Sequence, residues 1–242
     1  MASDMSPRSA LIVVDMQEDF CHPNGSLAVQ GGREISSTIN ALLSKPGFDM
    51  RIATQDYHPS DHISFASNHP EPNNKPFIST IKMQNPAPGK ESEVKDQQLW
   101  PVHCVADTFG AEIIPEIELR RVNFAVQKGM HSLVEMYSVF ADAFGNRDPV
   151  INRQSVRMDV AAALTLMGIN HVFVVGLAGD YCVKHTAMDA VKAGFKTWVI
   201  EEATRCVVPE AWGTVKEELE AAGVSVVSMC DPIVQELESN TH

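Results

Sequence analysis

Apolar and polar positions divide the chain into segments with two different periods. Six segments rich in β-branched and other apolar residues predict buried strands: 9–15, 48–56, 121–129, 171–179, 196–204 and 224–230. Four segments between them repeat apolar residues at helical spacing: 33–45, 155–169, 183–191 and 209–223. Strands that alternate with helices form parallel sheets with right-handed crossovers. We therefore predict a three-layer α/β/α fold around a mostly parallel six-stranded sheet, with helices on both faces.

One long stretch, at about residues 57–100, interrupts this alternation. It is rich in Pro, Asn, Ser and Lys and has no sustained period, so we predict a loop excursion. Excursions of this length are usually functional, and both a lid and an interface are open roles for residues 66–98. No internal repeat, low-complexity tract or linker divides the sequence. We therefore expect residues 1–242 to form a single domain.

Composition narrows the classes of partner. The 242 residues carry a formal net charge of −12, which argues against nucleic acid and anionic membranes as partners. Residues 1–15 resemble neither a signal peptide nor a membrane span, and the five cysteines are widely spaced free thiols by pattern. We expect a cytoplasmic homo-oligomer with a small-molecule substrate; nuclear or peroxisomal residence stays open.

Three reactive side chains follow the ends of predicted strands. Asp15 ends the first strand, Lys128 lies near the end of the third, and Cys182 follows the fourth. Each of these residue types is more often structural when it occurs alone. In an open α/β sheet, however, ligands bind outside the carboxyl ends of the strands. Together these residues supply a carboxylate that accepts a thiol proton, an ammonium group, and a thiol at a helix start, where the thiol pKa is lowered. This combination predicts an acyl-transfer site.

A second group of polar residues predicts a metal site. Asp56 and His58 lie on one side of an extended segment because alternate residues point the same way, and His103 supplies a third ligand. One carboxylate and two imidazoles suit Zn, Fe, Mn or Co with open positions for water or substrate. Spacing alone leaves His62 and His69 as rival ligands. The glycines of "GLAG" before Cys182 indicate a tight turn that brings backbone N–H groups toward an oxyanion.

Five motifs in order carry a resemblance to a known family: "LIVVDMQEDFCHPNGSLAV", "ATQDYHPSDHISFAS", "LWPVHCV", "AVQKGMH" and "GLAGDYCVKHTAMDAVKAGF". They resemble the nicotinamidases (pyrazinamidases) of the isochorismatase-like cysteine hydrolases, most closely the fungal and other eukaryotic members. The resemblance runs from about Ser9 to Cys230. It implies hydrolysis of the carboxamide of nicotinamide to nicotinate and ammonia through a cysteine thioester, in NAD salvage, with pyrazinamide as a further substrate.

Family roles transfer onto the matching positions of this sequence. The catalytic triad of the family matches Asp15, Lys128 and Cys182. The ligands of its one divalent metal ion match Asp56, His58 and His103, and zinc is favoured over iron or manganese. A cis peptide bond matches Leu177–Ala178, and the oxyanion hole matches the N–H groups of Ala178 and Cys182. The aromatics that sandwich the pyridine ring match Phe20, Trp100 and Tyr181.

Two further residues near the metal motif have counterparts in some members of the family. Some relatives use a histidine at a position like His62 as a metal ligand, whereas the fungal enzymes, which "QDYHPSDHISFA" resembles, do not, so we leave His62 out. Glu135, in a segment similar to the eukaryotic enzymes, is a candidate to contact metal-bound water.

Four rival functions are open at this point. An amidohydrolase of N-carbamoyl or ureido compounds shares the triad, but such relatives generally lack the metal site, and isochorismatases lack the cysteine nucleophile. A hydrolase that uses metal-bound hydroxide leaves Cys182 structural. A non-enzymatic metal-binding protein leaves the arrangement of Asp15, Lys128 and Cys182 unexplained.

Overall fold

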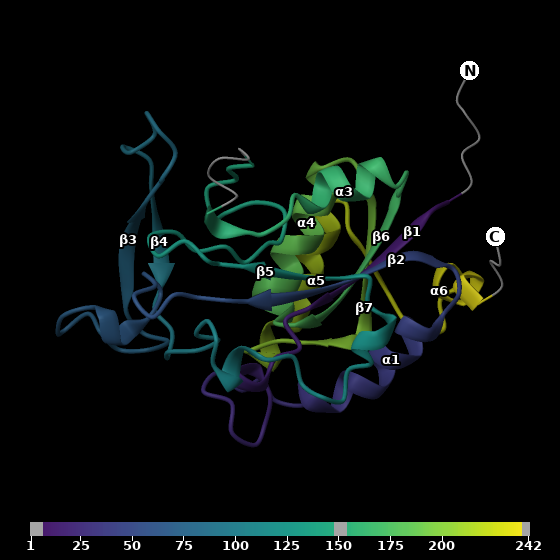
Figure 1. Ribbon diagram of the computed structural model, residues 1–242, viewed down its shortest axis with the longest axis horizontal. Coiled ribbons are helices and arrows are strands. Elements are labelled where there is room, and N and C mark those ends of the chain that lie inside the picture. The colour runs from purple at the N-terminus through teal and green to yellow at the C-terminus, as the bar shows by residue number, and fades with distance from the viewer. Residues whose placement is uncertain (1–6, 148–153, 239–242) are drawn as a thin grey trace.

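The computed structural model describes residues 7–147 and 154–238. In this part of the chain, six strands form one sheet in which every neighbouring pair is parallel, in the order β5-β2-β1-β6-β7-β8. The strands span Ser9–Val14 (β1), Phe48–Asp56 (β2), Phe124–Lys128 (β5), His171–Leu177 (β6), Lys196–Arg205 (β7) and Ser225–Val227 (β8). Figure 1 shows this sheet running through the middle of the molecule.

Helices cover both faces of the sheet because its central strands are apolar on both sides. Residues of α1 (Ser36–Ser44) and α6 (Pro232–Gln235) pack with Leu11 and Val13 of β1 in one apolar core. Residues of α3 (Val160–Leu166), α4 (Lys184–Lys192) and α5 (Trp212–Ala221) pack with Ile12 and Val14 in the other. Alternate residues of one strand thus belong to opposite cores, as strand geometry requires. The predicted three-layer α/β/α fold is confirmed.

Two helical predictions differ from the structure. The helix predicted over 155–169 begins only at Val160, because the Asp159 side chain caps it by accepting a hydrogen bond from the Ala162 N–H. Val156 instead forms an isolated bridge with Lys128. The helix predicted over 183–191 is preceded by a π-helical turn at Gly179–Val183, and Cys182 lies in this turn. The short helix α6 was not predicted.

The long excursion contains regular structure that the sequence did not indicate. Strands β3 (Thr80–Gln84) and β4 (Val94–Gln98) form an antiparallel hairpin, which Figure 1 shows beside the main sheet. Most of their side chains are exposed or half-buried, with Met83 and Gln97 the buried exceptions. The hairpin therefore lacks the alternating apolar pattern by which a strand is recognised.

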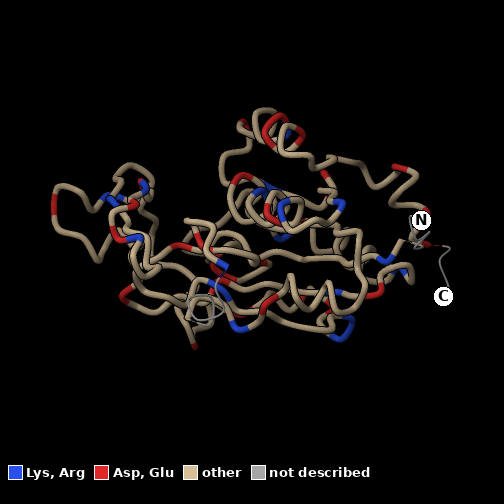
Figure 2. Tube along the Cα trace, turned by 90° about the horizontal axis from the view of Figure 1, so that it is seen from above, with Lys and Arg blue, Asp and Glu red and all other residues tan. Residues whose placement is uncertain are grey.

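Charge is distributed without a basic stripe. Figure 2 shows acidic and basic residues interspersed along the trace. No helix in the described ranges is long and apolar enough to cross a membrane.

Candidate active site

The three reactive residues meet at the carboxyl edge of the sheet. Asp15 directly follows β1 and has a φ of 48°, so the chain turns out of the sheet at this residue. Lys128 is the last residue of β5, and Cys182 lies in the π-helical turn after β6. All three side chains are buried. Strands that are separated in sequence bring them together because their carboxyl ends share one edge.

Lys128 is the central residue of this group. Its Nζ lies 2.9 Å from Asp15 Oδ2, 2.5 Å from Asp56 Oδ1 and 3.5 Å from Cys182 Sγ. It also donates to the Met136 carbonyl at 3.3 Å. The ammonium group is fully buried, and charge pairing of this kind is required to keep a buried cation in place. The two carboxylates and the thiol are therefore organised around one cation.

The pKa shifts of Asp15 and Lys128 suit the transfer of a proton from the thiol to Asp15. Burial raises the pKa of Asp15, with Lys128 acting in the opposite direction and Asp56 adding to the rise. Although burial opposes it, the pKa of Lys128 is raised well above its usual range by Asp15 and Asp56, so this group stays charged. A carboxylate with a raised pKa is a stronger proton acceptor. A carboxylate oxygen of Asp15 lies within 4.8 Å of Cys182 Sγ, close to the proton that it would accept.

The thiol itself behaves differently from the prediction. A helix start was expected to lower its pKa, but burial raises the pKa of Cys182 well above its usual range; Lys128 opposes the rise, and Asp15 and Asp56 add to it. The expectation of a lowered pKa is wrong because the thiol is buried and two carboxylates lie near it. The raised pKa favours the protonated thiol of Cys182, which would need a base beside it to react as a nucleophile.

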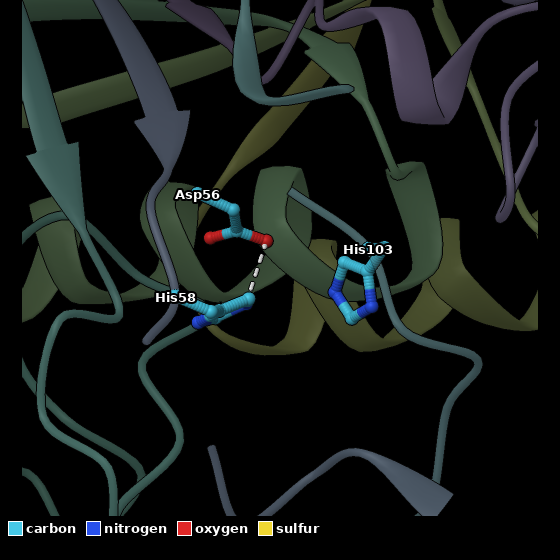
Figure 3. A group of neighbouring side chains, drawn as sticks. All are labelled: Asp56, His58 and His103. Atoms are coloured by element: carbon cyan, nitrogen blue, oxygen red, sulfur yellow. Dashed lines mark ion pairs between the residues drawn. The ribbon is translucent and has the colours of Figure 1, made fainter. Parts of the chain in front are cut away.

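The predicted metal ligands converge next to this group. Ligand atoms of Asp56, His58 and His103 all lie within 4.8 Å of one another, and all three side chains are buried. Figure 3 shows them turned toward one shared space, with His58 Nε2 lying 3.6 Å from Asp56 Oδ2. His58 Nε2 is buried and has no hydrogen-bond partner among the described residues. A buried nitrogen without a partner, facing a carboxylate, fits a site for a cation.

Each histidine is oriented by its other ring nitrogen. His58 Nδ1 lies 2.7 Å from the Gly129 carbonyl, and His103 Nδ1 lies 2.8 Å from the Pro101 carbonyl. Such backbone contacts fix the tautomer that leaves Nε2 for a metal. Burial, followed by neighbouring His58, lowers the pKa of His103 to about 4, so this ring is the neutral form that binds metals. Gly129 has a φ of +68°, and a Cβ there would lie 2.5 Å from the His58 ring.

The rival ligands are placed less favourably. His62 also lies within 4.8 Å of ligand atoms of His58 and Glu135. Its two ring nitrogens, however, contact Ser64 Oγ at 2.8 Å and the Val134 carbonyl at 3.3 Å. His69 contacts the Ile63 carbonyl through Nε2 and belongs to none of the candidate metal groups in the described residues. The carboxylate of Glu135 accepts a hydrogen bond from the Met136 N–H.

An aromatic pocket lies above the thiol. The predicted ring-binding residues Phe20, Trp100 and Tyr181 line one cavity with Cys182 and Ala178. Its lining is completed by Leu27, Asp56, His103, Tyr137 and Val207. The Trp100 and Tyr181 rings meet edge to face with centroids 4.9 Å apart. The structure also contains the Leu177–Ala178 cis peptide bond that the family resemblance implied.

Tyr137 is a pocket residue that the sequence analysis did not identify. Its hydroxyl accepts hydrogen bonds from Trp100 Nε1 at 3.1 Å and from Gln97 Nε2 at 2.8 Å. Gln98, the neighbour of Gln97 on β4, accepts a hydrogen bond from the Tyr181 hydroxyl at 3.3 Å. Strand β4 of the excursion thus contacts two aromatics of the pocket, Tyr137 and Tyr181. Tyr137 lies within "HSLVEMYSVF", the segment around Glu135 that is similar to the eukaryotic enzymes. This similarity was the one sequence feature that could have pointed to Tyr137.

The fold and the site define a class of three-layer α/β/α proteins in which a buried thiol, ammonium group and carboxylate lie beside an aromatic pocket and a candidate metal site. Residues 9–231 match the isochorismatase domain. The chain belongs to the isochorismatase family.

Comparison with individual proteins places the chain near one branch of that family. It is 38% identical to a nicotinamidase of Saccharomyces cerevisiae over 224 residues, which cover 90% of this chain and 98% of the relative. The structure of yeast nicotinamidase bound to the inhibitor nicotinaldehyde superposes with a TM-score of 0.81 at 36% identity, covering 91% of this chain and 99% of that one. A Pyrococcus horikoshii pyrazinamidase in complex with zinc has a TM-score of 0.67 at 30% identity, covering 92% of this chain and 99% of that one.

Proposed function

We propose that this protein is a nicotinamidase, which hydrolyses nicotinamide to nicotinate and ammonia. One observation carries the proposal: the Cys182 thiol lies 3.5 Å from the Lys128 ammonium, which also pairs with Asp15, at the base of an aromatic pocket. A pocket lined by Phe20, Trp100 and Tyr181 suits a flat aromatic ring. Similarity to nicotinamidases over most of the chain supports this substrate. We propose that the reaction serves NAD salvage.

Acylation begins with proton transfer. Asp15 accepts the Cys182 thiol proton, and the sulfur forms a bond to the carboxamide carbon of the substrate. The carbonyl π electrons move onto the oxygen, where the N–H groups of Ala178 and Cys182 stabilise the negative charge. Asp15 then gives its proton to the departing nitrogen, the C–N bond breaks, and ammonia leaves. The product on the enzyme is a nicotinoyl thioester on Cys182.

Deacylation repeats these roles with water. Asp15 removes a proton from a water molecule, whose oxygen attacks the thioester carbon. The C–S bond breaks, nicotinate leaves, and the sulfur regains the proton from Asp15. Throughout both halves, Lys128 holds the Asp15 carboxylate in place and offsets the negative charge that forms on the sulfur.

Asp56, His58 and His103 would hold one divalent metal ion beside the pocket. When bound, this ion supplies a Lewis acid for the ring nitrogen of the substrate. We propose zinc, because the donor set of one carboxylate and two imidazoles suits it and because a related pyrazinamidase was crystallised with zinc. That relative also supports pyrazinamide, a carboxamide on a similar flat ring, as a second substrate.

Release of ammonia and nicotinate from nicotinamide by the purified protein tests the proposed function. We expect turnover that is lost after dialysis against a chelator and regained when zinc is added. Absence of ammonia release by the zinc-loaded protein would contradict the proposal.

The metal site makes a separate prediction. His103→Ala removes one of three ligands and should weaken zinc binding by more than about 100-fold, since replacing even groups that only support metal ligands costs 10–100-fold. Competition with a chelating dye measures the affinity. His69→Ala is the matched control, because this histidine lies in the excursion that precedes His103 but contacts the Ile63 carbonyl. Equal zinc affinity in the two variants would place the metal elsewhere.

A further inference from the structure

Gln17 makes an unusual set of contacts with one residue of the proposed site. It lies two residues after Asp15 and is fully buried. Its Nε2 donates to the Asp56 carbonyl at 2.8 Å, and its Oε1 accepts from the Asp56 N–H at 2.8 Å. The same Nε2 also donates to the Ala111 carbonyl at 2.9 Å. Both N–H groups of the side-chain amide are thus used, and both backbone polar groups of Asp56 are satisfied by one side chain.

The course of β1 explains why Asp56 needs such a partner. Strands β1 and β2 pair up to Val13 and Ala53, and the Asp15 N–H still donates to the Thr54 carbonyl at 3.2 Å. At Asp15 the chain turns away with a φ of 48°. Even-numbered residues at this end of β2 direct their backbone groups toward β1, so the departure of β1 leaves those of Asp56 without a strand beside them. The Gln17 amide replaces the missing strand, exchanging N–H and C=O bonds as a paired strand residue does.

Asp56 contacts both the buried Lys128 and the proposed metal ligand His58. One of its carboxylate oxygens lies 2.5 Å from Lys128 Nζ, and the other lies 3.6 Å from His58 Nε2. The direction of this carboxylate depends on the backbone of Asp56, which is the last residue of β2. We infer that Gln17 is a positioning residue that fixes the Asp56 backbone and thereby aims its carboxylate at both the metal site and Lys128.

This inference rests on the proposed metal site, and it predicts the effect of removing the amide while keeping the length of the side chain. Gln17→Met should weaken zinc binding by about 10–100-fold, the range observed when groups that orient metal ligands are replaced. Excess zinc should restore part of the lost activity, because the ligands themselves remain. Zinc affinity is measured by dye competition, and zinc content is measured after dialysis, both independently of turnover.

Gln55 provides a matched control. Its Nε2 donates to the same Ala111 carbonyl at 2.8 Å, but its side chain has no hydrogen bond to Asp56. Gln55→Met should therefore bind zinc like the unmodified protein. Gln17→Asn, which keeps an amide but is one methylene shorter, should also weaken zinc binding.

The possible outcomes separate the two proposals. If the unmodified protein does not bind zinc, the proposed metal site is wrong. If it binds zinc and Gln17→Met binds equally well, or if Gln55→Met weakens binding to the same degree, the positioning role is wrong. Failure of both Gln17 variants to fold, with Gln55→Met folded, would also overturn it, because Gln17 would then support the whole domain.

Discussion

Cys182→Ala is expected to lower kcat for nicotinamide by about 10⁴-fold or more, the scale seen when the nucleophile of a catalytic triad is removed. In the proposed mechanism, the sulfur forms the only covalent bond between enzyme and substrate. Neither Asp15 nor Lys128 offers a replacement nucleophile, because one is the base and the other is a cation paired with it. Steady-state ammonia release measures the effect in zinc-loaded protein.

A second buried thiol, Cys206, provides the control for the Cys182→Ala variant. Cys206 is also buried, and burial followed by Asp180 raises its pKa to about 12, but no ammonium group contacts it among the described residues. Cys206→Ala should keep kcat near that of the unmodified protein. Substantial activity in Cys182→Ala would favour the rival mechanism, in which metal-bound hydroxide attacks the substrate.

Lys128→Met is expected to destabilise the metal-free protein by about 3–5 kcal/mol, because removing one partner of a buried ion pair leaves an uncompensated buried charge. Here the change leaves two carboxylates, Asp15 and Asp56, without their shared cation. Activity should also be lost, since the base is no longer held and the thiolate charge is not offset. Urea unfolding in the presence of a chelator measures the free energy of unfolding.

Two further variants test the cause of this instability. Lys45 is also a buried lysine, but its ion-pair partner, Glu238, is largely exposed, so Lys45→Met should cost no more than about 1 kcal/mol. Adding Asp15→Asn to Lys128→Met removes one of the two unpaired carboxylates and should recover part of the stability without recovering activity. Equal stability of the Lys128→Met and Lys45→Met variants would contradict the account.

The sequence predicts the sheet and the meeting of its strand ends well. Buried parallel strands are continuous β-branched runs, and β1, with Leu11 and Val13 on one face and Ile12 and Val14 on the other, shows why. Because parallel strands end at one edge, Asp15, Lys128 and Cys182 were expected to lie near one another, and the structure brings them into contact. Their catalytic roles stay predictions until they are tested.

Features that depend on single polar contacts were not predictable in this way. The cap at Asp159 delays α3, and the hairpin that contacts Tyr137 has few buried apolar residues. The amide of Gln17 bonds to a backbone 39 residues away, which leaves no periodic signal in the sequence. The pKa of Cys182 was mispredicted because a helix start is visible in a sequence, whereas the extent of burial around one thiol is not.

Nicotinamide turnover in the presence of hydroxylamine tests the central claim most directly. A thioester on Cys182 can transfer its acyl group to this added nucleophile, so we predict that ammonia is released and that nicotinate is partly replaced by nicotinohydroxamate as hydroxylamine increases. Both products depend on the same acylation step, so Cys182→Ala should form neither at an appreciable rate. Ammonia release with nicotinate as the sole product at every hydroxylamine concentration, or no ammonia release at all, would contradict the account.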